Sequence, residues 1–159
     1  MRFDKLTTKF QQAFADAQSL ALGNDCGFIE PQHLLAALLA QEDGGTTSLL
    51  ARAGVAVPKL QVALKASIGR LPKVEGTGGE IGVSRDLNNL LNLTDKEATK
   101  RGDQFIASEL FLLALADDKG ETGRMLRDAG LAKKSLADAI EAVRGGGGVA
   151  SQELSLIHI

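Results

Sequence analysis

Apolar residues recur at helical spacing along most of the chain, and two stretches carry nearly the same pattern. Residues 28–40 read FIEPQHLLAALLA, and residues 105–116 read FIASELFLLALA. Apolar positions three and four residues apart are typical of helices that bury one face. Both stretches are therefore predicted to contain such a helix.

The two stretches belong to a longer internal repeat with an offset of 77 residues. Over the best-matched part, five of eleven aligned positions carry the same residue. Upstream, Thr7 aligns with Ser84, and downstream, after a deletion of one residue, Gly54 aligns with Gly130. Solenoid repeats usually have periods of about 20 to 50 residues, so a longer period that occurs twice indicates a duplicated subdomain.

Each copy contains four segments with helical periodicity, and several of them have recognisable starts. The first helix begins at Thr7 or Thr8, because Thr8 and Gln11 have the spacing of a capping box. Its counterpart in the second copy begins at Ser84. The second helix of the first copy begins at Pro31, since proline is well suited to a first helical turn.

The ends of the helices and the boundaries between copies are marked by glycine and proline. The third helices are predicted to end at Gly54 and Gly130, where a left-handed cap is favourable. The fourth helices are expected at about 59–68 and 135–143. Glycines and a proline then break the periodicity at 69–83, which indicates a linker between the copies.

These breaks divide the chain into a domain and a tail. The domain is expected over 1–147, with the first copy at about 1–68 and the second at about 84–144. Residues 148–159 have no counterpart in the repeat, and we expect a flexible, vector-derived tail there. The glycine run before the tail predicts a mobile tether.

Composition narrows the class of protein. The chain has 159 residues, 44% of them hydrophobic, and a formal charge of −2. The chain has no cluster of basic residues that would bind a phosphate backbone, so it is not expected to bind nucleic acid. It also has no apolar run long enough to cross a bilayer, so it is not expected to enter a membrane. One cysteine and no signal-peptide pattern favour a cytoplasmic location, and the fragment is expected to be monomeric. The absence of Trp and Tyr predicts a weak, adaptable binding surface.

Few residues offer catalytic or metal-binding chemistry. The glycines of 76–82 lack the strand and the Gly-Lys-Ser/Thr ending of a phosphate loop. His33 has no nearby partner ligand and is interpreted as a packed or surface histidine, and Cys26 as an unreactive thiol. Asp103 and Glu109 could form an acid–base pair, or they could simply begin the helix that follows them. The second interpretation is favoured, so no cofactor, metal or catalytic residue is predicted for this chain.

A difference between the copies is more informative. The second copy is more apolar at three positions: Leu93 against Asp16, Leu110 against His33 and Leu113 against Ala36. Such an excess indicates either packing between the copies or an exposed patch for a partner. Leu93 and Leu110 together are the best candidates for a binding groove.

Several stretches of the chain resemble the amino-terminal domains of bacterial ClpB disaggregases. They are MRFDKLTTKFQQAFADAQSLALGND, RLPKVEGTGG and KRGDQFIASELFLLAL. The resemblance implies an all-α domain of two pseudo-twofold-related four-helix repeats. It also implies two AAA+ ATPase modules in a hexameric ring, with their ATP and Mg²⁺, outside this fragment, which by itself is no enzyme.

The resemblance further implies that the domain captures unfolded or aggregated polypeptides and passes them to the ring, in cooperation with the DnaK system. The residues implied for substrate binding are Leu93, Leu110, Leu113, Asp103 and Glu109. Thr7 and Ser84 are implied as functional positions, and their places in the pattern predict helix caps. Glu97 stands where relatives often have an apolar residue. Two alternatives stay open: an adaptor-docking domain, and a small enzyme that uses Asp103 and Glu109.

Overall fold

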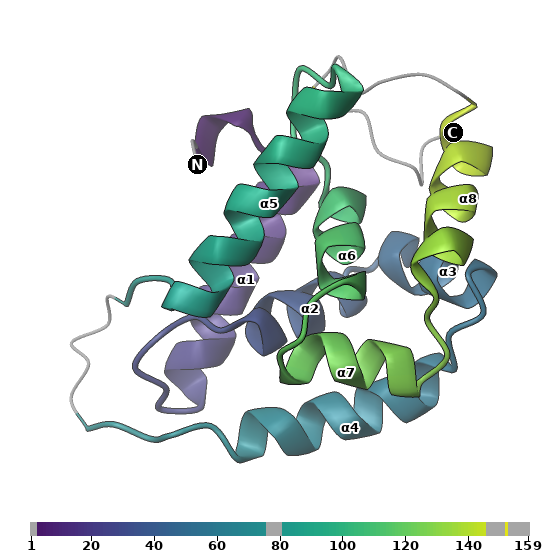
Figure 1. Cartoon of the computed structure of the whole chain (residues 1–159). Helices are drawn as coiled ribbons and strands as arrows, with labels where there is room; N and C mark the ends of the chain where they lie inside the picture. The colour runs from purple at the N-terminus through teal and green to yellow at the C-terminus, as the bar shows by residue number, and fades with distance from the viewer. Residues whose placement is uncertain (1–2, 76–80, 146–151, 153–159) are drawn as a thin grey trace.

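The computed structural model describes residues 3–75, 81–145 and 152, and this part of the chain is helical without a β-strand. A short 3-10 helix at Phe3–Lys5 is followed by eight α-helices (Figure 1). They are α1 (Thr8–Gly23), α2 (Pro31–Leu39), α3 (Gly45–Arg52), α4 (Val57–Gly69), α5 (Arg85–Arg101), α6 (Ser108–Ala116), α7 (Glu121–Asp128) and α8 (Lys133–Arg144). The all-α prediction is therefore confirmed, with four helices in each copy.

Hydroxyl side chains begin the first helix of each copy. Thr7 Oγ1 accepts a hydrogen bond from the backbone N–H of Phe10 at 3.3 Å, and Ser84 Oγ accepts one from Leu87 at 3.1 Å. Of the two starts considered for α1, the cap is thus Thr7. Gln11, which the capping-box spacing pairs with Thr8, instead donates from its side-chain amide to the carbonyl of Leu6 at 3.1 Å.

The third helix of each copy ends, as predicted, at a glycine with a positive φ angle. Gly54 has φ of +94° after α3, and Gly130 has φ of +113° after α7. At Gly130 an added Cβ would also lie 2.8 Å from the carbonyl oxygen of Gly54. The two turns therefore meet closely, and the second turn needs glycine for space as well as for conformation.

Contacts between the copies are reciprocal, which is the signature of a pseudo-twofold axis. Isolated parallel bridges join Leu6 to Ile106 and Ile29 to Val83, and each bridge is the other displaced by 77 residues. Likewise the N–H of Thr7 donates to the carbonyl of Ile106, and that of Ser84 donates to Ile29, both at 3.0 Å. Helix α3 packs on α8, and its counterpart α7 packs on α4.

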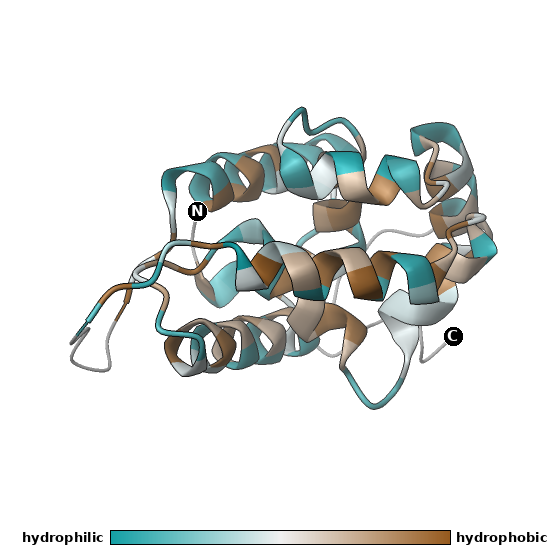
Figure 2. Cartoon of the chain, turned by 90° about the horizontal axis from the view of Figure 1, so that it is seen from below, coloured by the Kyte–Doolittle hydropathy of each residue, from teal (hydrophilic) through white to brown (hydrophobic). Residues whose placement is uncertain are grey.

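One hydrophobic core spans both copies. Helices α2 and α6 are its central elements, and most of their side chains are buried. Apolar residues occur around the whole of α6, because α5, α7 and α8 all pack against it. Figure 2 shows hydrophobic and hydrophilic residues alternating along the helices, the pattern expected of helices that bury one face.

Parts of the linker and tail are held to the domain. The N–H of Val74 donates to the carbonyl of Asp25 at 2.8 Å, and the backbone carbonyl of Gln152 accepts from Thr8 at 3.0 Å. Linker residues 76–80, most of the glycine run and the rest of 148–159 lie outside the described residues. The mobile tether and the flexible tail stay predictions.

Candidate functional site

The three leucines proposed for a groove do not share one environment. Leu93 has 51% of its surface exposed, whereas Leu110 and Leu113 are 0% and 3% exposed. Leu110 is therefore not a surface residue, and Leu113 offers only an edge to solvent. The prediction of a groove lined by all three side chains is wrong.

The reason lies in the packing of α6. The position of Leu110 is buried in both copies, since its counterpart His33 is also 0% exposed. The two copies differ there in polarity and not in accessibility. The apolar excess at Leu110 and Leu113 is thus packing of α6 against α5, α7 and α8, which belong to the same copy. It is neither the packing between copies nor the exposed patch that the sequence suggested.

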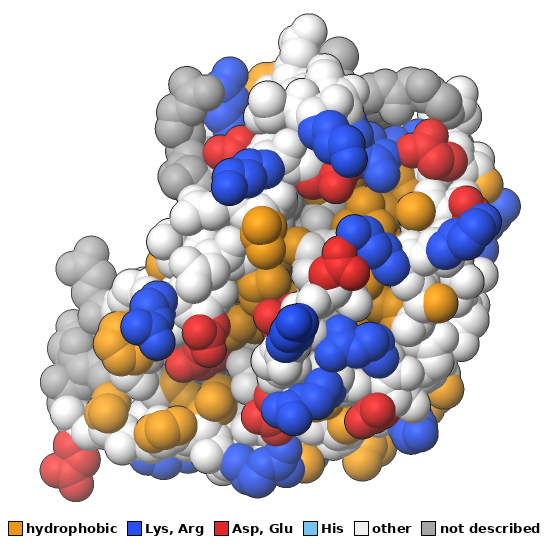
Figure 3. Space-filling view, viewed as in Figure 1, with side chains coloured by type: hydrophobic (Ala, Val, Ile, Leu, Met, Phe, Trp, Pro, Cys, Tyr) orange, Lys and Arg blue, Asp and Glu red, His pale blue; other side chains and the backbone are white. Residues whose placement is uncertain are grey.

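Leu93 lies on α5 between two clefts. The first, here called the α7 cleft, has a volume of about 400 Å³ and is bordered by α5, the start of α2 and the start of α7. The second, the α8 cleft, has a volume of about 240 Å³ and lies between α5, α6 and the start of α8. Figure 3 shows a strip of hydrophobic side chains beside α5, flanked by charges of both signs.

The two clefts share Leu93 and are otherwise lined by different side chains. The α7 cleft carries four carboxylates: Glu30, Asp86, Asp118 and Glu121. The charged residues of the α8 cleft are Glu97, Asp117, Lys96, Lys100 and Lys133. An apolar segment with a basic neighbour would find complementary charge in the first cleft, and mixed charge in the second.

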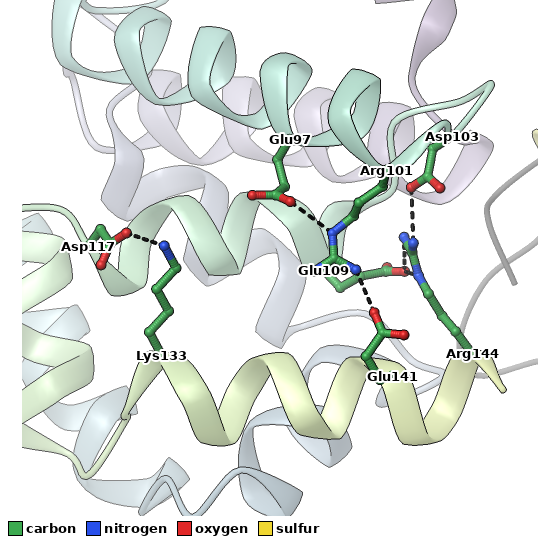
Figure 4. A network of polar contacts seen from close by, with 8 residues as sticks. All are labelled: Glu97, Arg101, Asp103, Glu109, Asp117, Lys133, Glu141 and Arg144. Carbon is green, nitrogen blue, oxygen red and sulfur yellow. Dashed lines mark hydrogen bonds and ion pairs between the residues drawn. The ribbon is translucent and has the colours of Figure 1, made fainter. Parts of the chain in front are cut away.

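Asp103 and Glu109 face each other across one arginine inside the protein (Figure 4). Arg144 Nη1 lies 3.0 Å from Asp103 Oδ2, and Arg144 Nη2 lies 2.9 Å from Glu109 Oε2. The Nε of Arg144 also donates to Glu109 Oε2 at 3.1 Å. The side chains of Arg144, Asp103 and Glu109 are 4%, 0% and 6% exposed. Neither carboxylate is therefore placed to touch a client.

This ion pair network joins the turn after α5, the first turn of α6 and the last turn of α8. Glu109 does begin α6, as favoured above, whereas Asp103 precedes the helix and is not part of it. Arg144 was not singled out from the sequence, although it continues the spacing of Leu136 and Ile140 along a buried stripe. An arginine at such a position indicates a carboxylate partner nearby, because a charge inside a protein has to be paired.

Burial raises the pKa of Glu109, and the lowering influence of Arg144 does not fully offset it. A raised carboxyl pKa is one feature that an enzyme would need. However, neither Glu109 nor Asp103 lines the clefts beside Leu93, and Arg144 fills the space between them. The geometry favours a structural role for both carboxylates over acid–base catalysis.

A second network limits the α8 cleft. Glu97 Oε2 accepts from Arg101 Nε at 2.9 Å, and Arg101 Nη1 donates to Glu141 Oε1 at 2.7 Å (Figure 4). Lys133 pairs with Asp117 at the other end of the cleft. Glu97 thus helps to tie α5 to α8 and makes this wall of the cleft polar.

His33 and Cys26 have the structural roles favoured from the sequence. His33 Nδ1 accepts from the N–H of Glu30 at 2.9 Å, at the start of α2. Burial, together with Lys73, lowers the pKa of His33 to about 4, so the side chain is neutral. Burial raises the pKa of the Cys26 thiol, which therefore stays protonated.

Two further features of the described residues bear on the class of protein. Within ranges 3–75 and 81–145, no group of histidine, cysteine and acidic side chains is arranged to hold a metal ion. No helix in those same ranges combines the length and apolar character that crossing a membrane requires.

Sequence comparisons place the chain among Clp proteins. A family described as the Clp repeat (R) N-terminal domain matches residues 5–129. The chaperone protein ClpB of Vibrio cholerae is 49% identical over 146 residues, which are 92% of this chain and 17% of the relative. ClpB of Pseudomonas putida is 46% identical over 149 residues, or 94% of this chain and 17% of the relative. The chain spans less than a fifth of these relatives.

Solved structures show the same fold. The N-terminal domain of Hsp104 from Candida albicans superposes with a TM-score of 0.81 at 20% identity, covering 94% of this chain and 97% of that one. The N-domain of ClpV in complex with a VipB peptide gives a TM-score of 0.74 at 19% identity, covering 91% and 90% of the two chains. With the duplicated four-helix repeat and its reciprocal contacts, these matches show that the chain belongs to the Clp N-terminal repeat family and corresponds to the amino-terminal domain of ClpB.

Proposed function

We propose that this domain captures exposed apolar segments of unfolded or aggregated proteins for a disaggregase. The observation that carries the proposal is Leu93, a half-exposed leucine on a ridge between two clefts. A large apolar side chain held by a rigid helix between concave surfaces is a suitable contact for apolar client residues.

The mechanism is weak, non-directional burial with an electrostatic preference. Complete burial of a leucine is worth about 1.5–3 kcal/mol, and half of Leu93 is already covered, so this contact alone supports only low affinity. Glu121 of the α7 cleft is paired with Arg70, and the other three carboxylates of the cleft favour apolar segments that carry lysine or arginine. Low affinity suits a domain that has to release its client.

The rest of the proposal concerns the longer protein. Relatives named chaperone protein ClpB support a place for this domain beside AAA+ ATPase modules, which would hold the ATP and Mg²⁺. Delivery of clients to a hexameric ring, cooperation with DnaK and a cytoplasmic location are part of the same proposal. Several domains around one ring would strengthen weak binding by multivalency.

The test is an NMR titration of the domain with a permanently unfolded, aggregation-prone polypeptide. Perturbed amide signals are expected around Leu93 and both clefts, and Leu93→Gln is expected to weaken the binding severalfold without lowering the melting temperature. Val62→Gln is the matched control, since Val62 is 73% exposed on α4 and does not line either cleft. Equal binding by the wild type and Leu93→Gln would refute the proposal.

Adaptor docking is the second candidate. It is favoured by the ClpV N-domain, a domain of this fold whose structure was solved with one defined peptide. A folded adaptor is expected to saturate at a fixed stoichiometry and to leave a single footprint. Binding of that kind, without measurable binding of unfolded polypeptides, would replace the client-binding proposal.

A further inference from the structure

The first copy carries an apolar cleft of its own, remote from Leu93. It has a volume of about 520 Å³ and lies where the carboxyl-terminal ends of α1, α2 and α4 converge. We call it the repeat-one groove. Its lining residues are Leu20, Asn24, Ala36, Leu39, Ala40, Gln61, Leu64, Lys65, Ile68 and Gly69.

The same place in the second copy is largely closed by charged side chains. The offset of 77 residues, or 76 after the deletion, gives the equivalent pairs Leu20 and Glu97, Asn24 and Arg101, Ala40 and Asp117, Lys65 and Glu141, and Ile68 and Arg144. There the Glu97–Arg101–Glu141 network ties α5 to α8, and the α8 cleft measures only about 240 Å³. In the first copy this site is open and mostly aliphatic.

The groove fits a helix better than an extended chain. Its walls are three α-helices, whose backbone N–H groups at this end are already hydrogen-bonded within each helix or at its carboxyl-terminal cap. An extended segment would find few backbone partners there, whereas a helix satisfies its own N–H and C=O groups. The aliphatic lining can accommodate side chains spaced three and four residues apart on one helical face.

The charge at the rim of the groove favours a partner with the opposite charge. Lys65 is the one charged residue among the described side chains that line the groove. It is exposed and forms no salt bridge with another described residue. A carboxylate beside the apolar face of the partner would therefore pair with Lys65.

We propose that the repeat-one groove docks an amphipathic helix of another polypeptide, with a short aliphatic face and a glutamate or aspartate facing Lys65. The site goes beyond the client-binding surface, since Leu93 does not line it. The domain would then carry two different surfaces: a ridge for unfolded segments and a groove for a defined helix.

The test uses a synthetic helical peptide of about 14 residues, with leucines at i, i+3, i+4 and i+7 and one flanking glutamate. In an NMR titration, the perturbed amides are expected along the carboxyl-terminal halves of α1, α2 and α4. A version with two central prolines, of the same composition otherwise, controls for binding of extended apolar segments. It is expected to bind at least tenfold more weakly.

Three variants import the residue of the second copy into the groove: Ala40→Asp, Leu20→Glu and Lys65→Glu. Ala40 and Asp117 have the same helix-end conformation, with ψ of −5° in both, and Ala40 is exposed, so Ala40→Asp is expected to fold normally. Ala40→Asp and Leu20→Glu should each weaken the peptide at least tenfold. Lys65→Glu should weaken it severalfold, and a peptide with lysine in place of glutamate should recover binding to that variant.

Other outcomes would overturn the proposal. Equal binding by the wild type and Ala40→Asp, or perturbations confined to the surroundings of Leu93, would show that the groove does not hold the helix. Equal binding of the proline-containing peptide would assign the groove to extended clients, and a concentration-dependent dimer abolished by Ala40→Asp would assign it to a second copy of the domain. Leu93→Gln is expected to leave peptide binding unchanged, which separates this proposal from the client-binding one.

Discussion

Replacing Arg144 by methionine is expected to destabilise the domain strongly. The substitution keeps the length and apolar stem of the side chain but removes the guanidinium that lies 3.0 Å from Asp103 and 2.9 Å from Glu109. Both carboxylates would then be left inside the protein without their shared cation. The burial of all three side chains makes this site unlike the other ion pairs in the described part of the chain.

The magnitude follows from that burial. The side chains are 4%, 0% and 6% exposed, and removing one partner of a buried ion pair typically costs about 3–5 kcal/mol. For a chain of this size that corresponds to a melting temperature lower by roughly 6–20 °C. Lys134→Met is the matched control, since Lys134 and its partner Asp138 are 88% and 70% exposed, and it is expected to leave the melting temperature unchanged.

The assay is thermal unfolding of Arg144→Met at neutral and acidic pH, with and without the added changes Asp103→Asn and Glu109→Gln. Burial already raises the pKa of Glu109, and loss of Arg144 raises it further, so the folded variant binds a proton more readily than the unfolded chain. The deficit should therefore be largest well above the raised pKa and should shrink as the pH falls through it.

Neutralising both carboxylates in the variant should recover most of the lost stability at neutral pH. For Arg144→Met alone, a melting temperature within about 2 °C of the wild type, or a deficit that is the same at neutral and acidic pH, would refute this account of the site. Confirmation would mean that substitutions at Asp103 or Glu109 affect function through stability and not through client contact.

Three further predictions concern single residues. Thr7→Ala and Ser84→Ala should each cost about 1 kcal/mol of unfolding free energy and weaken client binding only in proportion, because each removes one cap hydrogen bond; a loss of binding at unchanged stability would instead indicate direct contact. Leu110→Gln should unfold much of the protein at 37 °C, since the side chain is 0% exposed; a native-like melting curve would contradict its burial. Because burial lowers the pKa of His33 to about 4, its neutral form stabilises the fold above its ordinary pKa of 6.5, and this contribution is lost as the pH falls toward 4; His33→Gln should flatten that part of the stability profile, and parallel profiles for the two proteins would count against it.

The sequence predicts the helices well because their signals are local. Thr7, Pro31, Ser84, Gly54 and Gly130 mark helix ends through their own side chains or backbone angles, and each lies where such a residue is expected. The duplication can also be predicted from the sequence, because it requires only that the chain be aligned with itself. The reciprocal contacts are its consequence in three dimensions.

Exposure was harder to predict, because it depends on what packs against a helix from elsewhere in the chain. The apolar run of α6 is equally compatible with a surface groove and with a central helix, and only its contacts with α5, α7 and α8 decide for Leu110. The pairing of Arg144 with Glu109 joins residues 35 positions apart, so no periodicity within one helix reveals it.

The repeat-one groove also has a counterpart in the sequence. The differences between the copies at Leu93, Leu110 and Leu113 are positions where the second copy is more apolar. The opposite differences, Leu20 against Glu97 and Ile68 against Arg144, mark where the first copy is more apolar. They coincide with the larger cleft.

The reciprocal bridges also set the order in which the domain can be completed during synthesis. The amino-terminal segment at Leu6 pairs with Ile106, which lies about 100 residues further along the chain, and translation adds about 5–20 residues per second. The first copy therefore spends roughly 5–20 s on the ribosome with its leading segment unpaired. The two halves become a finished domain only when the second has emerged, so a ribosome stalled at the linker would hold a first copy that lacks its partner surface.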